Sequence, residues 1–246
     1  MTTILCIVFF FSGASALIFE MLWFHLAGIT FGNSVWATAI VLSSFMGGLA
    51  LGNGLAALLG HRIKSPIRLY AFIEITIAIS GFALVLLFPN LTELLSPMFR
   101  IFRDQAVILN AMRGIIAIFL MLAPATAMGA TLPVLVKALY SEKPNYGTVL
   151  GILYGWNTLG AMVGVLCGEV YFIEWFGVTR SGLVAVTFNL IAAAVAIRLS
   201  VIRRGTQDDH TRAKGTATLF PFSHNTKRFL FAGFSREIFI VVTVLP

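Results

Sequence analysis

Charged side chains are scarce in this chain. Only 11% of its 246 residues are Asp, Glu, Lys or Arg, whereas 59% are hydrophobic. A soluble domain of this size carries about 25% charged residues, so this chain cannot cover its surface with polar groups. The scarcity excludes an ordinary soluble domain and predicts an all-α, polytopic membrane protein whose main partner is the lipid bilayer.

The residues that catalytic and metal sites require are also few. Cys6 and Cys167 both lie inside apolar runs, where they act as small hydrophobic residues and not as a disulfide or metal site. No HExxH, CxxC, Walker loop or nucleophile elbow occurs in the sequence. We therefore expect no metal, no cofactor and no catalytic residue, and the pattern argues against an enzyme.

Long apolar runs are abundant, and six of them are long enough to span a bilayer as helices. We place the spans at 4–28, 34–60, 69–87, 107–140, 149–176 and 182–202. The predicted organisation is a six-span transmembrane bundle at 1–204, a polar cytoplasmic tail at 205–228 and a short apolar piece at 229–246. The mixed polar composition of the tail predicts disorder from about 205 to 226.

Basic residues stand in short clusters between the spans. The net charge of +7 could suit nucleic acid, but this distribution is more typical of a topology signal, so no nucleic acid is expected as a partner. One side of the bundle has Arg62, Lys64, Arg68, Lys137, Lys143, Arg198, Arg203 and Arg204, against Arg100, Arg103 and Arg180 on the other. The first side is predicted to be cytoplasmic, with the N-terminus inside.

Three ionisable residues are predicted at one depth inside the spans. Glu20, Arg113 and Glu169 each lie about 12 Å from the outer end of their span, at a rise of about 1.5 Å per residue. A charge in such a run costs several kcal/mol unless it is paired or faces water. The three residues form either a structural ion pair or a site for a proton or cationic substrate, in which one carboxylate stays available.

Two further polar residues are candidates for the same site. Glu74 lies about five residues into the third span, and we expect it to be within reach of Arg68. Asn157, near the middle of the fifth span, is expected to line a central cavity.

Glycines recur in the second and fifth spans and predict close helix packing. The packing candidates are Gly48, Gly52, Gly160, Gly164 and Gly168. They mark either a static interface or a surface along which helices slide during transport.

Several short runs in this order resemble one known family. They are SG (12–13), GNS (32–34), FMGGLALG (45–52), MGATLP (128–133) and NTLGA (157–161), with Glu20, Trp23 and Glu74. Over about residues 8–200 the chain resembles the membrane part of the fused major-facilitator/spermidine-synthase-like proteins of bacteria. The resemblance implies a six-helix bundle of major-facilitator half type in the inner membrane, beside a second half and an aminopropyltransferase-like domain.

The sequence departs from that family in three places. The family usually has an Arg where this chain has His25, and the catalytic domain with its nucleotide-binding loop is missing. The run FLFAGFS (229–235) repeats the pattern of FFFSGAS (9–15), as a seventh span would, but Ile240 stands where the counterpart of Glu20 is expected. We expect that the chain is truncated or altered near Ser235.

These observations leave three hypotheses of function. The chain is a carrier half-bundle for a small cationic, polyamine-like solute, completed by a second six-helix half or a homodimer. Alternatively it is a non-transporting anchor or scaffold for an aminopropyltransferase-type domain, or a truncated remnant of such a fusion.

The distribution of basic residues predicts which loops are cytoplasmic. In a background with Cys6→Ala and Cys167→Ala, a cysteine at position 64 or 143 should react with an impermeant thiol reagent only from the cytoplasmic side. A cysteine at position 100 should react only from the outside. Labelling of intact cells and inside-out vesicles tests this orientation, and one reversed site would contradict the six-span topology.

Overall fold

The computed structural model describes residues 2–32, 34–102, 104–140 and 146–217, and these are helical almost throughout. The helices are α1 (Thr2–Phe31), α2 (Val35–Leu59), the 3₁₀ turn η1 (Gly60–Arg62), α3 (Pro66–Ile101), α4 (Ala106–Tyr140), α5 (Tyr146–Cys167), the π-helical η2 (Gly168–Phe172) and α6 (Ile173–Ala217). No strand occurs in these ranges. The predicted all-α class is confirmed.

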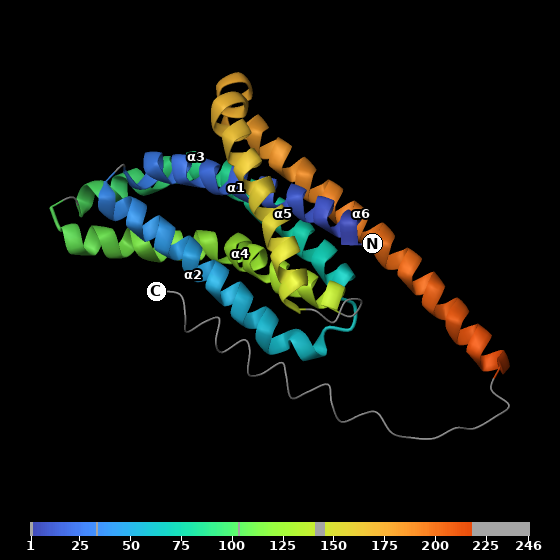
Figure 1. Ribbon diagram of the computed structural model, residues 1–246. Coiled ribbons are helices and arrows are strands. Elements are labelled where there is room, and N and C mark those ends of the chain that lie inside the picture. The colour runs from blue at the N-terminus through green and yellow to red at the C-terminus, as the bar shows by residue number, and fades with distance from the viewer. Residues whose placement is uncertain (1, 33, 103, 141–145, 218–246) are drawn as a thin grey trace. The chain divides into compact units, whose positions relative to one another are not determined.

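Five helical stretches are long and apolar enough to cross a membrane, judged by length and composition. The last of them, Gly147–Arg203, has 57 residues, which is far more than one crossing needs. It is interrupted at Gly177, whose φ of 73° and ψ of 173° are not helical. The chain turns at Gly177, which lies inside α6, so residues 146–176 and 178–217 form two separate helices (Figure 1).

Local sequence signals explain several helix ends. Gly32 has a φ of 93°, a left-handed conformation that terminates α1. The Ser34 hydroxyl then accepts a hydrogen bond from the Ala37 amide and caps α2. Pro66 stands in the first turn of α3, where its missing N–H leaves no backbone carbonyl unpaired.

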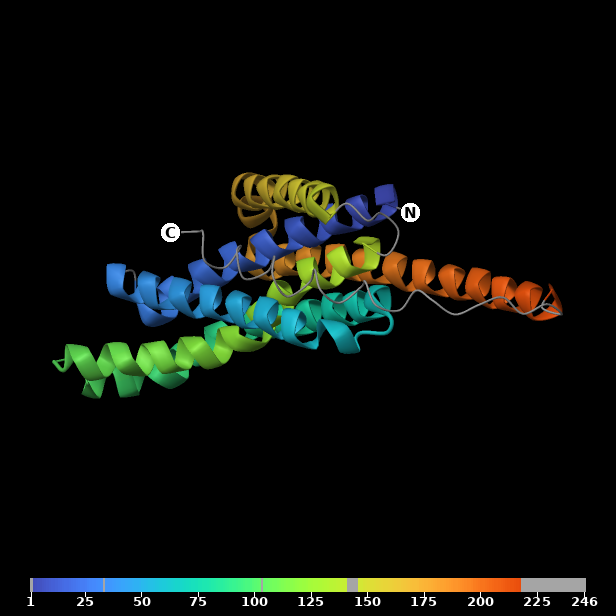
Figure 2. The ribbon, with the colours of Figure 1, turned by 60° about the horizontal axis from the view of Figure 1, so that its bottom comes forward.

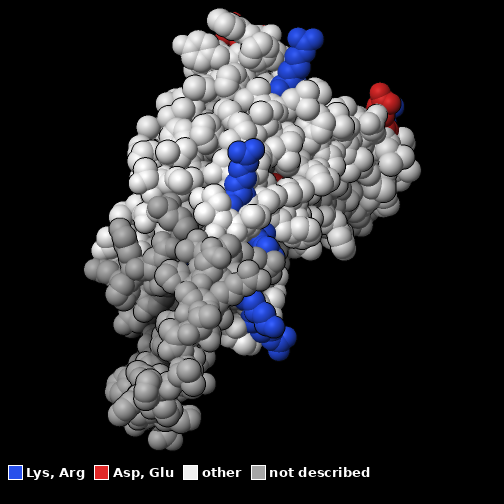
Figure 3. All heavy atoms as spheres, turned by 90° about the vertical axis from the view of Figure 1, so that its right-hand side faces the viewer, with Lys and Arg blue, Asp and Glu red and all other residues white. Residues whose placement is uncertain are grey.

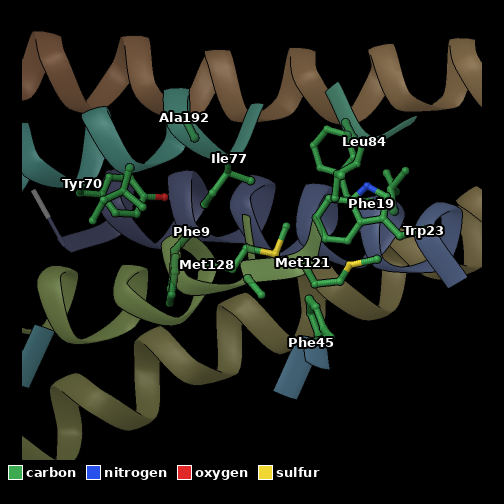
Figure 4. Packing of buried hydrophobic residues seen from close by; sticks show 14 of the residues in the cluster. Phe9, Phe19, Trp23, Phe45, Tyr70, Ile77, Leu84, Met121, Met128 and Ala192 are labelled. Carbon is green, nitrogen blue, oxygen red and sulfur yellow. The ribbon is translucent and has the colours of Figure 1, made fainter. Parts of the chain in front are cut away.

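Within residues 1–203, α2 packs along α4, α1 packs along α5, and α3 contacts both α1 and α4 (Figures 1 and 2). Aromatic and aliphatic side chains from these helices fill the space between them (Figure 4). Trp23 of α1 illustrates the packing, because its ring stacks on Phe19 and its Nε1 donates a hydrogen bond to the Gly81 carbonyl of α3. The helix that contributes most to the interior is α1.

The five glycines expected to pack helices all lie at helix crossings. A Cβ on Gly52 would collide with the Thr126 carbonyl of α4, and a Cβ on Gly160 or Gly164 would collide with the backbone of α1. Gly48 faces Ala125 at 2.5 Å, and Gly168 faces the Met21 side chain at 2.9 Å, both measured from an ideal Cβ. The close approach therefore depends on the absence of side chains at these positions.

Glycines recur every four or five residues along α5, at positions 151, 155, 160 and 164, and only part of this glycine stripe is in contact with another helix. Gly151 and Gly155, which continue the stripe toward the start of α5, have nothing within 4 Å of an ideal Cβ. Gly13 of α1 and Gly129 of α4 pack as closely as the predicted positions, against Asn157 and Leu49 respectively. The periodicity alone did not distinguish contact glycines from open ones.

The C-terminal part of the sequence differs from the prediction. The last helix, α6, continues to Ala217, so the expectation of disorder from residue 205 is wrong for 205–217. The remaining tail and the apolar piece at 229–246 lie outside the described residues.

A pair of substitutions on one helix tests the importance of the glycine contacts. Gly160→Ala places a methyl group against the Phe10 carbonyl and should destabilise the protein by about 1–3 kcal/mol, the usual effect of overpacking. Gly155→Ala meets open space and should be neutral, or stabilising by about 0.5–1 kcal/mol. Thermal unfolding in detergent measures both, and equal stabilities would contradict a close α1–α5 contact.

Candidate functional site

Two of the three charges predicted at one level belong to segments that meet. Glu20 is half-buried on α1, and Glu169 is exposed on η2. The two segments are in contact where Gly168 packs against Met21. The residues next to the two carboxylates are therefore in contact, although no hydrogen bond joins Glu20 to Glu169.

Arg113 lies elsewhere. Its guanidinium stands over the Phe99 ring, 5.3 Å from the centroid, and its Nη2 is 4.0 Å from the place of a Cβ on Gly32. Gly32 follows Glu20 by 12 residues, which is about 18 Å along a helix axis. Arg113 is thus held near the C-terminal end of α1 by a cation–π contact.

The expected ion pair between Arg113 and either carboxylate is therefore wrong within the described residues. The depth estimate took the third span to end at residue 87, but α3 runs to Ile101. The α3–α4 end extends beyond the ends of α1 and α2 (Figure 2). Counting inward from the start of α4 consequently overestimated the depth of Arg113.

Glu74 is the carboxylate that the structure encloses completely. Its side chain has no solvent-accessible surface, and the Ser12 hydroxyl of α1 donates a hydrogen bond of 2.6 Å to its Oε1. The expected pairing with Arg68 is wrong, because a separation of six positions places the two side chains on different faces of α3. Within the described chain, the Glu74 Oε2 has no hydrogen-bond partner.

Two further polar side chains of the interior were missed by sequence reasoning. Tyr70 precedes Glu74 by one helical turn, is fully buried, and packs edge-on against Phe9 (Figure 4). Asn189 of α6 is 1% exposed. Among the described atoms, the Tyr70 hydroxyl and both amide atoms of Asn189 lack partners. The four-residue spacing of Tyr70 and Glu74 was the available signal.

Asn157 lies at a helix crossing. Its backbone carbonyl and Oδ1 face Gly13 of α1, and the side chain is half-buried. The structure thus places it between α5 and α1. Its assignment as a wall of a substrate cavity stays a prediction.

The hollows found in the described part of the chain are apolar grooves. One of about 520 Å³ lies between α2, α3 and α4 and is lined by residues such as Leu55, Phe72 and Phe119. Another of about 340 Å³ lies between α2 and α4, next to Trp36 and Ile118. Neither groove is lined by an ionisable residue, and the described residues contain no cluster of His, Cys, Asp and Glu that could hold a metal ion.

Basic side chains are sparse and well separated on the face seen in Figure 3. Lys137, in the last turn of α4, has a structural role, since its Nζ donates to the carbonyls of Gly60 and Ile63. It thereby binds the backbone that leads from α2 to α3.

The chain is distantly similar to one characterised protein. It is 22% identical over 205 residues to polyamine aminopropyltransferase 1 of Streptomyces coelicolor, and the alignment covers 82% of this chain and 35% of that protein. The chain therefore spans about a third of the length of this relative. No family model and no solved structure matches.

The hydrogen bond from Ser12 should contribute measurably to stability. Ser12→Ala leaves Oε1 of a buried carboxyl group without its donor, so the free energy of unfolding should fall by about 1–3 kcal/mol. Ser80→Ala is the control, because its hydroxyl donates only to the Thr76 carbonyl of the same helix and its loss should be nearly neutral. Equal effects in detergent unfolding would contradict the importance of the Ser12–Glu74 bond.

Proposed function

We propose that this chain is the membrane-spanning domain of a protein of the polyamine aminopropyltransferase (spermidine synthase) kind, and that it anchors an aminopropyltransferase-type domain at the cytoplasmic face of the bacterial inner membrane. The observation that carries the proposal is the span of the distant similarity. It covers most of this chain but only 35% of the relative, and the described part of this chain consists largely of long apolar helices.

The packing of the helices supports an anchor. The interior is filled by apolar side chains, and backbones meet directly at the glycine crossings. Such close-packed interfaces resist rearrangement. The loop after α2 is also fixed by Lys137. An anchor needs a stable bundle and a defined cytoplasmic side, and the basic clusters favour the side that also carries Lys64.

A carrier of a small cationic solute is the second candidate. The layer of Glu20, Arg113 and Glu169 that favoured it is absent, which places it behind the anchor. It retains support from Glu74, a carboxyl group inside the bundle without a basic partner among the described residues. As a half-bundle of major-facilitator type, the carrier would need a second six-helix half or a second copy of the chain.

The anchor proposal predicts where the enzymatic activity is found. In cells carrying the native gene, aminopropyltransferase activity should sediment with the membranes. Deleting codons 1–204 should move it to the soluble fraction with little loss of total activity, because the anchor takes no part in catalysis. This holds whether the aminopropyltransferase domain is part of the same gene product or a separate protein that docks on this chain. Gly155→Ala is the control and should leave the activity with the membranes. Activity that is soluble in the unmodified cells would contradict the proposal.

Uptake of labelled polyamines into proteoliposomes separates the two candidates. An anchor gives no uptake above protein-free vesicles. Uptake that is lost in a folded Glu20→Gln or Glu74→Gln variant would favour the carrier.

A further inference from the structure

Polar side chains converge in the apolar interior between α1, α3 and α6. Ser12, Tyr70, Glu74 and Asn189 are each at least nine-tenths buried. Only one hydrogen bond between these side chains, Ser12 to Glu74, has good geometry. Buried polar groups normally have hydrogen-bond partners. Four atoms of this group, the Tyr70 hydroxyl, the Glu74 Oε2 and both amide atoms of Asn189, make no hydrogen bond of good geometry among the described atoms, although the Tyr70 hydroxyl and the Glu74 carboxyl group interact.

The register of the helices places Asn189 at the same level as this group. The helices α1 and α3 run parallel, because Phe9 meets Tyr70 and Ser12 meets Glu74. The helix α6 runs antiparallel to α1, since Ser15 donates to the Ala185 carbonyl and Phe11 packs on Phe188. Asn189 lies one turn after Ala185 on the same face and is therefore level with Ser12.

No basic side chain faces Glu74 from the packed helices. The stretch 182–197 of α6 and the stretch 114–136 of α4 contain no ionisable residue. On α1 the titratable neighbours are Cys6 and, two turns beyond Ser12, Glu20; on α3 there is Tyr70. Arg113 and Lys137 are engaged with Phe99 and with the carbonyls near α2. A buried carboxylate without a countercharge is costly.

We propose that Glu74 is a proton-binding site inside the bundle, at which a proton from solvent binds to and leaves Oε2. With the proton bound, Oε2–H donates to the Tyr70 or Asn189 oxygen while Ser12 still donates to Oε1. With the proton released, Oε2 accepts from the Tyr70 hydroxyl or the Asn189 amide. The unpartnered atoms include both donors and acceptors, so the cluster can solvate both forms. This inference does not depend on the anchor proposal.

Infrared spectroscopy of the purified protein in lipid tests the proposal. The C=O stretch of a protonated carboxyl group should be lost and recovered reversibly in a titration between about pH 5 and pH 9, the range reached by carboxyl groups in buried sites. It should be absent at every pH in Glu74→Gln and retained in Glu20→Gln. Ser12→Ala should move this band to higher frequency, because the carbonyl oxygen loses its hydrogen bond.

Three outcomes would overturn the proposal. A band that persists through the titration means a fixed acid that does not exchange its proton. An ionised carboxylate whose signal responds to Na⁺ or K⁺ means a metal cation in place of the proton. If Glu74→Gln does not fold, the comparison of the wild-type protein with Ser12→Ala still tests the proposal. A titrating C=O band that Ser12→Ala leaves unchanged belongs to a residue other than Glu74.

Discussion

The close approach of α1 to its neighbours is the constraint on which the rest of the bundle depends. Helices in lipid gain no hydrophobic driving force from meeting one another, so they associate through direct backbone packing and a few polar contacts. Gly160 and Gly164 let α5 lie against the backbone of α1. On its other sides α1 is held by hydrogen bonds from Trp23 to α3 and from Ser15 to α6.

That arrangement also decides where charge resides. The helices that enclose α1 bring Glu74 into an interior where it has no basic neighbour among the described residues. There the Ser12 hydroxyl donates a hydrogen bond to the Glu74 carboxyl group. The basic residues are engaged nearer the helix ends, Arg113 with an aromatic ring and Lys137 with backbone carbonyls. A layer of opposite charges at one depth would have suited a carrier, and the separation of Arg113 from Glu20 removes that support.

An anchor and a buried proton site are compatible in one bundle. The distant similarity is to an aminopropyltransferase, and this chain spans about a third of the length of that relative. The cluster around Glu74 concerns the helices themselves. The two inferences rest on different observations, and neither needs a polar cavity, because the grooves found along α2 and α4 are apolar.

The sequence by itself determined the all-helical class and the positions of the apolar runs. A segment that crosses a bilayer must be apolar over the thickness of the bilayer and must pair its backbone groups internally, so hydropathy and length reveal it directly. It also identified Gly160 as a helix-packing residue and Glu74 as an ionisable residue inside a span. It could not distinguish Gly160 from Gly155, nor place Arg113, because each depends on which helix lies opposite and how far that helix extends. Only the tertiary structure brought Asn189 of α6 level with Ser12 of α1. The pairing of helices distant in sequence is set by packing, which no local pattern encodes.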